Sequence, residues 1–519
     1  MHPAGGLNRG EWRSRTSWMV SRMSSPYRLC SRPPVPLALL RASLLSSMGL
    51  LACGADAVAP RLQLHSPTAG WSYTSRRVRA EFTAVDDTQL SSLSWSLNGS
   101  DFQSLPLEAA RDGTGFALEV APRPGGNTLT VRVTDAAGNS AEQAVDFHFG
   151  SLSACGGPHT GVVRQGSLYL WGFNNRGQLG LGAEVTTNQG SPQRVPGIEG
   201  VAFLALNNNQ SLALKEDGSV WAWGENTHGQ LGLGTPAGPG QPWTPDFTPH
   251  PTPTRIEGLS GAVALSAGYH HSLVLMEDGT VRAFGDNSAG QLGDGTLEAI
   301  RDFPVAVSGL TDVVKVVAGN RHSVALKRDG TVWTWGRNTY GTLGQGTQDD
   351  QPHPTPTQVP GVADVVDIAT GWEHVLALHA GGTLSSWGLN VSGQLGSGDA
   401  LTGEQRHTPL PVKGLADARF VFASGNVSHA RRADGTLVVW GENFNGQFGN
   451  GETAGTNVPV PLAERLQGVL TLSSSPVHAV AFLRDGTLWT WGLNISGSLG
   501  REGLRDRGLY PVPTQVPFP

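Results

Sequence analysis

The feature that most constrains the fold is a short phrase that recurs through the last two-thirds of the chain. Each copy opens with an aromatic residue and a glycine, and most continue as x-Asn-x-x-Gly-Gln-Leu-Gly. The copies begin at Trp171, Trp223, Phe284, Trp335, Trp387, Trp440 and Trp491, so successive starts are 52, 61, 51, 52, 53 and 51 residues apart. Such a period with strand-like content predicts a propeller or solenoid, in which no repeat buries its apolar face alone. Seven repeats favour a closed ring.

One well-preserved repeat, residues 313–361, shows the expected make-up of a single sheet. Its apolar and turn residues predict strands over 313–318, 323–327, 331–335 and 355–360. Asp329-Gly330 separates the second strand from the third, and Asp-Gly favours a two-residue type I′ hairpin turn, which needs positive φ at both central residues. The Trp of Trp-Gly and the Leu of Gln-Leu-Gly are predicted to pack between neighbouring sheets.

Three elements of this repeat are Gly-Asn-Arg-His-Ser (319–323), Asp-Gly-Thr-Val (329–332) and Trp-Gly-Arg-Asn-x-x-Gly-x-Leu-Gly (335–344). They resemble the repeat of the RCC1 (regulator of chromosome condensation) family. The resemblance implies an all-β fold class with a seven-bladed RCC1-type β-propeller, which we assign to residues 151–519. The last residues, PVPTQVP, nearly repeat the PTPTQVP that ends the repeat above. We therefore expect the C-terminal strand to complete the first blade and close the ring.

Residues 61–150 lack the repeat and carry a different pattern. Polar and apolar residues alternate over 77–82 and 128–134, as in half-buried antiparallel strands. The phrase GGNTLTVRVTDAAGN, residues 125–139, resembles bacterial immunoglobulin-like surface modules. We expect this segment to form a small immunoglobulin-like β-sandwich with Trp95 as its core aromatic residue.

The N-terminal residues have the pattern expected of a targeting signal. The apolar stretch 42–52 is too short to span a bilayer and suits a signal peptide. The LLAC phrase that ends at Cys53 resembles the lipobox of bacterial lipoproteins, so residues 1–53 are interpreted as a signal peptide with lipobox, lipidated at Cys53, and 54–60 as a linker. The alternative is an ordinary secretory signal, and the start codon could be Met23 rather than the first methionine. We expect a lipid anchor in the cell envelope, with the outer membrane favoured, or secretion.

The sequence offers no signature of catalysis or of nucleic-acid binding. Charged residues make up 15% of the chain, the net charge is −6 and no basic run occurs, so a phosphate-directed surface has no support. No Gly-x-Ser-x-Gly elbow, phosphate-binding glycine loop or His-x-x-x-His pair is present. Asp86, Asp87 and Asp135 could form a calcium site, but turn aspartates are far commoner. We therefore expect no cofactor and no metal.

Histidine recurs at nearly one position of the repeats. It precedes the aromatic-Gly pair by 12 or 13 residues at His159, His271, His322, His374 and His478. Gln210 takes this position in the second repeat, and we align the sixth repeat as two residues shorter, with His429 there. A residue that recurs at one position of the blades is expected to stabilise the blade itself. Structural hydrogen bonding is therefore preferred over metal binding or general-base catalysis as the role of these histidines. Histidines on different blades are also expected to lie too far apart to share one ion.

Variable positions inside constant repeats are where recognition is expected, because loops carry recognition on a rigid frame. Aromatic residues and arginine are favoured at protein interfaces. The candidate binding residues in the repeats are Tyr269, His270, Arg321, Tyr340, Trp372 and Phe444. Trp243 and Phe247 are further candidates in a Pro-rich insertion, 235–253, which could instead fold back as a cover on its blade.

The function predicted from the sequence is a non-enzymatic, monomeric envelope lipoprotein whose propeller binds an unknown protein or envelope ligand. One alternative is a hydrolase of envelope polysaccharide or peptidoglycan, which would need carboxylates converging in a pocket. Another is a purely structural envelope role. Guanine-nucleotide exchange, which the family name suggests, is disfavoured because the corresponding loops vary here and an exported lipoprotein would not meet such a GTPase.

Overall fold

The computed structural model describes residues 57–87, 89–107, 115–236, 243–399, 405–462 and 466–518. The chain divides into two units, residues 1–55 and 56–519, and every described residue belongs to the second. The predicted signal peptide and its Cys53 therefore lie outside the described residues. The ordered elements are the strands β1 to β36, so the fold is all-β. Within these described ranges no helix is long and apolar enough to cross a membrane.

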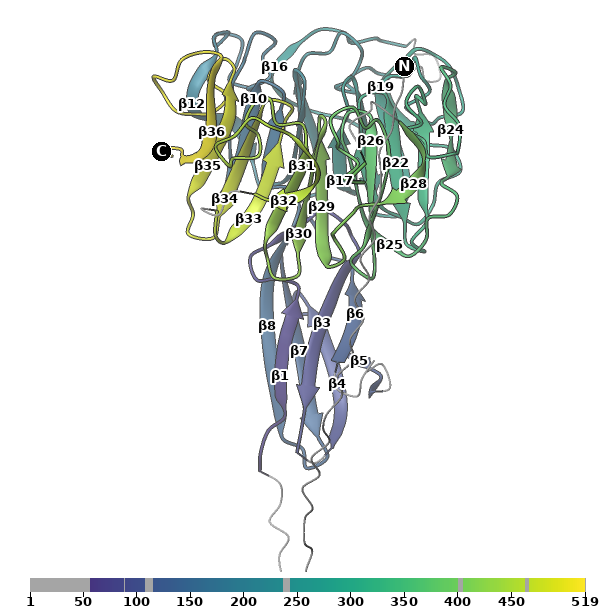
Figure 1. Cartoon of the computed structure of the whole chain (residues 1–519), viewed down its shortest axis with the longest axis vertical. Helices are drawn as coiled ribbons and strands as arrows, with labels where there is room; N and C mark the ends of the chain where they lie inside the picture. The colour runs from purple at the N-terminus through teal and green to yellow at the C-terminus, as the bar shows by residue number, and fades with distance from the viewer. Residues whose placement is uncertain are drawn as a thin grey trace, which may run out of the picture. The chain divides into compact units, whose positions relative to one another are not determined.

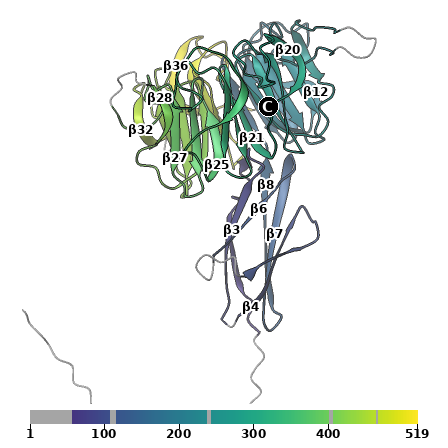
Figure 2. The ribbon, with the colours of Figure 1, turned by 90° about the vertical axis from the view of Figure 1, so that its right-hand side faces the viewer.

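Strands β9 to β36 form seven sheets of four antiparallel strands, one sheet per sequence repeat, which we number blades 1 to 7 (Figure 1 and Figure 2). Blade 1 contains β9 (Ser153–Gly156), β10 (His159–Arg164), β11 (Ser167–Gly172) and β12 (Gln189–Glu199). Blade 2 contains β13 (Val201–Asn207), β14 (Gln210–Lys215), β15 (Val220–Gly224) and β16 (His250–Arg255). Blade 3 contains β17 (Ala262–Ala267), β18 (His271–Met276), β19 (Val281–Asp286) and β20 (Ile300–Ala306).

The remaining blades repeat this plan. Blade 4 contains β21 (Val313–Ala318), β22 (His322–Lys327), β23 (Val332–Gly336) and β24 (His353–Gln358). Blade 5 contains β25 (Val365–Thr370), β26 (His374–His379), β27 (Leu384–Gly388) and β28 (Arg406–Pro411). Blade 6 contains β29 (Ala418–Ser424), β30 (Val427–Arg432), β31 (Leu437–Gly441) and β32 (Thr456–Pro461). Blade 7 contains β33 (Val469–Ser474), β34 (His478–Leu483), β35 (Leu488–Asn494) and β36 (Gly508–Gln515).

Blade 4 confirms the four strands predicted from its repeat, but the type I′ turn expected at Asp329-Gly330 is wrong. Only Gly330 has a positive φ, of 81°, while the Asp329 carboxylate accepts a hydrogen bond from the backbone N–H of Thr331 at 3.0 Å. The aspartate therefore acts as a side-chain cap of the turn. In blade 1, Gln165 and Gly166 both have positive φ, as a two-residue turn requires.

The seven blades close into a ring, but not by the strand exchange that the sequence suggested. β33 and β34 pack against β9, and the Cys155 backbone N–H donates to the Ser473 hydroxyl at 3.1 Å. β36 pairs with β35 as the fourth strand of blade 7, because β12 already supplies the fourth strand of blade 1. The C-terminal residues only pack onto blade 1, where Phe518 meets Tyr169 with ring centroids 4.8 Å apart.

The repeated large side chains fill the space between blades, as predicted. The tryptophans of the six Trp-Gly pairs and Phe284 are fully buried, and the leucine of each Gln-Leu-Gly, or the residue in its place, is no more than 2% exposed. The glycine after this leucine is required by space and by conformation. Gly344 has a φ of 69°, and a Cβ there would lie 2.8 Å from Nε1 of Trp387.

The first eight strands form two sheets that share one hydrophobic core. One sheet contains β1 (Arg61–Ser66), β3 (Val78–Val85) and β6 (Gly115–Val120). The other contains β2 (Ser72–Tyr73), β8 (Ser140–Phe149), β7 (Gly125–Asp135), β4 (Leu90–Leu97) and β5 (Gln103–Leu105). We call these strands the N-terminal strand group.

The centre of this core differs from the expectation. Phe82 and Phe116 stack within the buried cluster with ring centroids 5.5 Å apart, whereas Trp95 is only partly buried and packs against this cluster. The Asp135 carboxylate accepts hydrogen bonds from the backbone N–H groups of Ala137 at 2.8 Å and Asn139 at 2.9 Å. Asp135 therefore serves the turn that follows β7.

The N-terminal strand group contacts the propeller through both aromatic and backbone groups. Phe149 and Phe203 meet edge to face with ring centroids 5.0 Å apart. The Arg76 backbone N–H donates to the Val314 carbonyl at 3.1 Å, and its guanidinium donates to the Glu277 carbonyl at 2.8 Å. These contacts lie at the starts of inner strands and the turns after second strands. The loops that join inner to second strands lie at the other end of the same strands.

Candidate functional site

The recurring histidines lie between blades and carry structural hydrogen bonds. Nε2 of His271 in blade 3 bonds to the Ser323 hydroxyl of blade 4 at 3.0 Å. That hydroxyl donates to the Gln291 carbonyl of blade 3 at 2.7 Å, and Nε1 of Trp335 donates to the same carbonyl at 2.8 Å. One histidine, one hydroxyl and one tryptophan thus join blade 3 to blade 4.

Six histidines, which we call the inter-blade histidines, use Nε2 to reach a hydroxyl on the following blade: His159, His271, His322, His374, His429 and His478. The last of them bonds to Thr160 of blade 1, so the set runs around the ring. All are at most 1% exposed, and burial lowers their pKa values to about 3 or 4. They are therefore neutral at pH 7. Histidine recurs in the repeats because it forms the hydrogen bond that joins one blade to the next.

The sequence alignment of the sixth repeat was wrong. Val427 pairs with Gly441 in the same way that His374 pairs with Gly388, so Val427 occupies the recurring position. His429 lies two residues further along β30 on the same face, and it still reaches the Ser474 hydroxyl at 3.1 Å. Blade 6 therefore has the same length as the others over this hairpin.

A central cavity of about 270 Å³ is lined mainly by the inner strands of the blades. Its walls are mostly small or apolar side chains and backbone. Among the described residues that line it the only charged side chain is Lys315, whose Nζ lies 2.6 Å from a carboxylate oxygen of Asp367. No aspartate or glutamate is part of this described lining. The paired carboxylates that glycoside hydrolysis needs are thus not provided by these walls.

Three predicted binding residues come together where the inner strand of one blade turns into the second strand. Tyr269, Arg321 and Trp372 occupy this loop in blades 3, 4 and 5. The Tyr269 backbone N–H donates to the Gly319 carbonyl at 3.2 Å, and the Asn320 N–H donates to the Trp372 carbonyl at 3.0 Å. Neighbouring loops are therefore joined directly, and Trp372 also lines the central cavity. Tyr269 and Trp372 are each 39% exposed.

Two more predicted residues adjoin these loops. His270 follows Tyr269 and stacks on His228 with ring centroids 4.1 Å apart. Burial, and then the charge of His228, lower the pKa of His270 to about 4. The backbone N–H of Arg337 donates to the Arg321 carbonyl at 2.8 Å, and its guanidinium lies 6.0 Å from the ring centre of Tyr340. We call Tyr269, His270, Arg321, Tyr340 and Trp372 the rim.

One charged residue of this region was not among the predicted site residues. Glu373 is 5% exposed, and its carboxylate accepts a hydrogen bond from the Asn320 side chain at 2.9 Å. Burial raises its pKa. Glu373 holds the loop of blade 5 to that of blade 4, next to Trp372. The only available signal in the sequence was a carboxylate at a loop position that is not acidic in other repeats.

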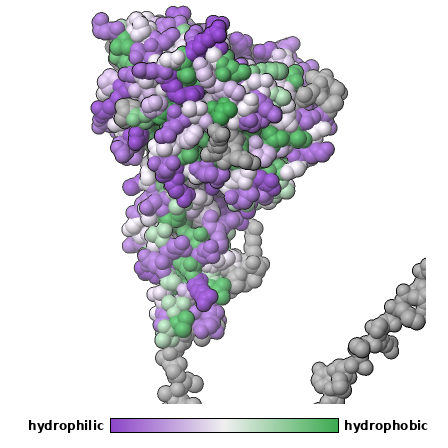
Figure 3. Space-filling view, turned by 60° about the vertical axis from the view of Figure 1, so that its left-hand side comes forward, coloured by the Kyte–Doolittle hydropathy of each residue, from purple (hydrophilic) through white to green (hydrophobic). Residues whose placement is uncertain are grey.

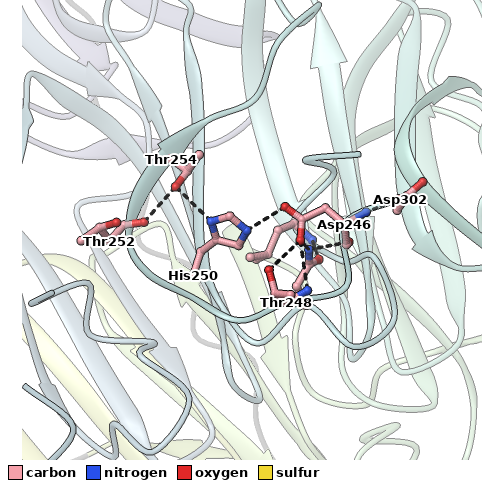
Figure 4. Close-up of polar contacts among 8 residues, drawn as sticks. Asp246, Thr248, His250, Thr252, Thr254 and Asp302 are labelled. Atoms are coloured by element: carbon pink, nitrogen blue, oxygen red, sulfur yellow. Dashed lines mark hydrogen bonds and ion pairs between the residues drawn. The ribbon is translucent and has the colours of Figure 1, made fainter. Parts of the chain in front are cut away.

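The other predicted residues lie elsewhere. Phe444 is in the loop after β31 of blade 6 and is 73% exposed. Trp243 belongs to the insertion of blade 2, and its Nε1 donates to the buried carboxylate of Asp302 in β20 at 3.0 Å. The backbone N–H of Asp246 donates to the other oxygen of Asp302 at 2.8 Å (Figure 4). Trp243 thus fastens the insertion to blade 3, while Phe247 is 37% exposed.

Comparisons with known proteins agree with this architecture. Residues 132–425, more than half of the chain, match the family model of the RCC1-like domain. The ultraviolet-B receptor UVR8 of Arabidopsis thaliana is 31% identical over 270 residues, which are 51% of this chain and 58% of the receptor. The human E3 ubiquitin-protein ligase HERC2 is 31% identical over 353 residues, which are 64% of this chain and 7% of the ligase. The chain therefore spans less than two-thirds of either relative.

Two solved structures show the same fold. Human WBSCR16 is 24% identical with a TM-score of 0.58, over 69% of this chain and 95% of that one. Yeast RCC1 (Prp20), solved with Kap60, is 24% identical with a TM-score of 0.59, over 71% of this chain and 85% of the matched chain. The repeats, the closed ring of blades and the family match lead to one conclusion: the chain belongs to the RCC1-like domain family.

Proposed function

We propose that this protein is a non-enzymatic lipoprotein of the cell envelope whose propeller binds another protein through the rim. The observation that carries the proposal is the backbone-linked row of Tyr269, Arg321 and Trp372 on three successive blades. Each side chain is held on a loop that is hydrogen-bonded to its neighbour, so little conformational entropy remains to be lost on binding. Aromatic and arginine side chains on such a frame are the usual anchors of protein interfaces.

Three further observations support a platform over an enzyme. The described lining of the central cavity holds no carboxylate, so this cavity does not offer the acid and base that the hydrolase alternative needs. On the face that Figure 3 shows, hydrophobic residues are scattered among hydrophilic ones, which suits a soluble surface with separate anchors. One relative, UVR8, is by its name a receptor, which suits a recognition role.

The envelope location and the immunoglobulin-like nature of residues 61–150 belong to the same proposal. The LLAC phrase supports lipidation at Cys53, and the two sheets with one core support a sandwich module between the anchor and the propeller. Labelling with a palmitate analogue tests the anchor. We expect label on the full-length chain and none on Cys53→Ser, and labelled Cys53→Ser would contradict the assignment.

Site-specific photocrosslinking in the intact host cell tests the rim. A benzophenone amino acid replaces Trp372 in one version of the full chain and Phe102, which is 37% exposed in the N-terminal strand group, in a control. We expect one discrete crosslinked protein with position 372 and none with position 102. The Arg321→Ala change should weaken the same crosslink. Adducts of equal pattern at both positions, or no adduct at 372, would refute recognition by the rim.

A further inference from the structure

A second cavity, of about 260 Å³, lies where the N-terminal strand group meets blades 5 and 6. Its lining comes from β1 to β3 and the turns between them on one side, and from β25, β26, β29 and β30 on the other. On the propeller side, the cavity is lined by residues at the starts of the inner strands and at the ends of the second strands of blades 5 and 6. The rim lies at the opposite ends of those strands, so the two places are separate.

The wall of this cavity combines aromatic and aliphatic surface. Trp71 and Phe420 meet edge to face with ring centroids 5.9 Å apart, and Trp71 is 4% exposed. Tyr73 and Val366 add further apolar surface. The Tyr73 hydroxyl accepts a hydrogen bond from the backbone N–H of Thr68 at 2.9 Å. The cavity thus offers an apolar body together with polar groups, as ligand pockets usually do.

Five of the described residues that line the cavity are arginines, and three of these are paired with a carboxylate. The three ion pairs are Arg77–Glu119 at 2.6 Å, Arg79–Glu81 at 2.9 Å and Arg432–Asp417 at 3.0 Å. The remaining acidic residue of the lining, Asp367, is paired with Lys315 at 2.6 Å.

The other two arginines, Arg419 and Arg431, have no carboxylate partner among the described residues. The Arg431 guanidinium lies 4.0 Å above the ring of Trp71. Among the described residues, the Arg419 guanidinium donates a hydrogen bond to the Ala418 carbonyl alone, at 3.5 Å. The cavity therefore carries two positive charges that its own walls leave uncompensated.

Burial makes this arrangement costly for Arg431 in particular. Desolvation is the main effect and lowers its pKa; the nearby Tyr73 raises the pKa, and Arg484 lowers it further. A partly desolvated guanidinium is stabilised by a hydrogen-bonded anion, and its planar fork fits both oxygens of a carboxylate. The Trp71 ring offers only a cation–π contact and leaves the N–H groups available.

We infer that this cavity binds a small organic carboxylate with an apolar body. The carboxylate meets Arg431 and Arg419, and the apolar body lies against Trp71 and Phe420. A volume of about 260 Å³ lies just below the usual range of ligand pockets, so the cavity suits a small molecule and not a folded or extended segment of protein. Since residues of the N-terminal strand group and of the propeller both line the cavity, the bound carboxylate holds these two parts together.

Isothermal titration calorimetry of the full chain tests the inference with benzoate and octanoate as probes. Benzamide and octanamide, which keep the apolar body and lose the charge, are the matched neutral probes. Inorganic phosphate tests a bare anion. We expect benzoate or octanoate to bind, and the amides and phosphate to bind at least about tenfold more weakly, since charged hydrogen bonds are worth more than neutral ones.

Arg431→Gln and Arg419→Gln should each weaken carboxylate binding by about tenfold or more, whereas Arg282→Gln, in β19 outside the cavity, should leave it unchanged. Arg419 is exposed, so its variant keeps the test decisive if Arg431→Gln does not fold. Amides that bind as well as acids, phosphate that binds as well as either acid, or both glutamine variants with unchanged affinity would overturn the inference. So would the absence of binding by both acids up to millimolar concentration.

Discussion

The joint between blades 7 and 1 gives the sharpest test of ring closure. Thr160 is fully buried; its hydroxyl bonds to Nε2 of His478 at 2.5 Å and donates to the Ser498 carbonyl at 2.8 Å. Thr160→Val keeps the volume and removes the hydroxyl. The carbonyl keeps its bond from Nε1 of Trp171, at 2.8 Å, whereas the buried imidazole N–H loses its acceptor. Leaving such a group unsatisfied costs about 1–3 kcal/mol.

Urea unfolding followed by tryptophan fluorescence measures this cost. For a slope of about 3 kcal/mol/M, the midpoint should fall by roughly 0.3–1 M. Ser323→Ala is the matched variant at the joint of blades 3 and 4, because Ser323 bonds to His271 and to the Gln291 carbonyl in the same way. The two variants should be destabilised to a similar degree. A normal midpoint for Thr160→Val, together with a lowered one for Ser323→Ala, would show that blades 7 and 1 are not joined.

The remaining predictions concern pH, glycine and the packing between blades. The inter-blade histidines have pKa values of about 3–4 in the folded protein, below the value near 6.5 in the unfolded chain. The free energy of unfolding is therefore unaffected by them above about pH 6.5 and decreases as the pH falls toward 4. The decrease is up to about 1.4 kcal/mol per pH unit for each histidine, because the unfolded chain binds a proton that the folded protein does not. His374→Gln, which copies the residue found in blade 2, should reduce the slope of unfolding free energy against pH by about one proton between pH 6 and 4.5, and an unchanged slope would contradict burial of a neutral imidazole. Gly344→Ala should be clearly more destabilising than Gly361→Ala, because both glycines have a φ near 70° but only the first would press a Cβ onto Trp387; equal melting temperatures of the two variants would refute the clash. Leu292→Ala, at a fully buried position, should cost about 2–5 kcal/mol in the same urea assay, and a cost under 1 kcal/mol would mean that the site is not packed as described.

Most of the fold could be predicted from the sequence because the residues that form the strands, turns and core of a blade all lie within one repeat. The tryptophan, the leucine of Gln-Leu-Gly and the turn glycine recur in register, so the strands of a blade and the large residues between blades could be predicted. The recurring histidines form structural hydrogen bonds, as their spacing predicted, although the spacing misaligned His429 in the sixth repeat. The candidate residues of the rim could be chosen because they vary where the frame is constant.

What the sequence could not supply depends on which segments meet. The PTPTQVP-like tail looks the same whether it completes blade 1 or blade 7, and only the pairing of β36 with β35 decides between them. The rim consists of loops about 50 residues apart, and the second cavity joins Trp71 to Arg431, 360 positions later. Repeat patterns are local, so they can be recognised in the sequence alone. Burial, unpaired charge and hydrogen bonds between loops depend on which distant segments the fold brings into contact, so only the tertiary structure determines them.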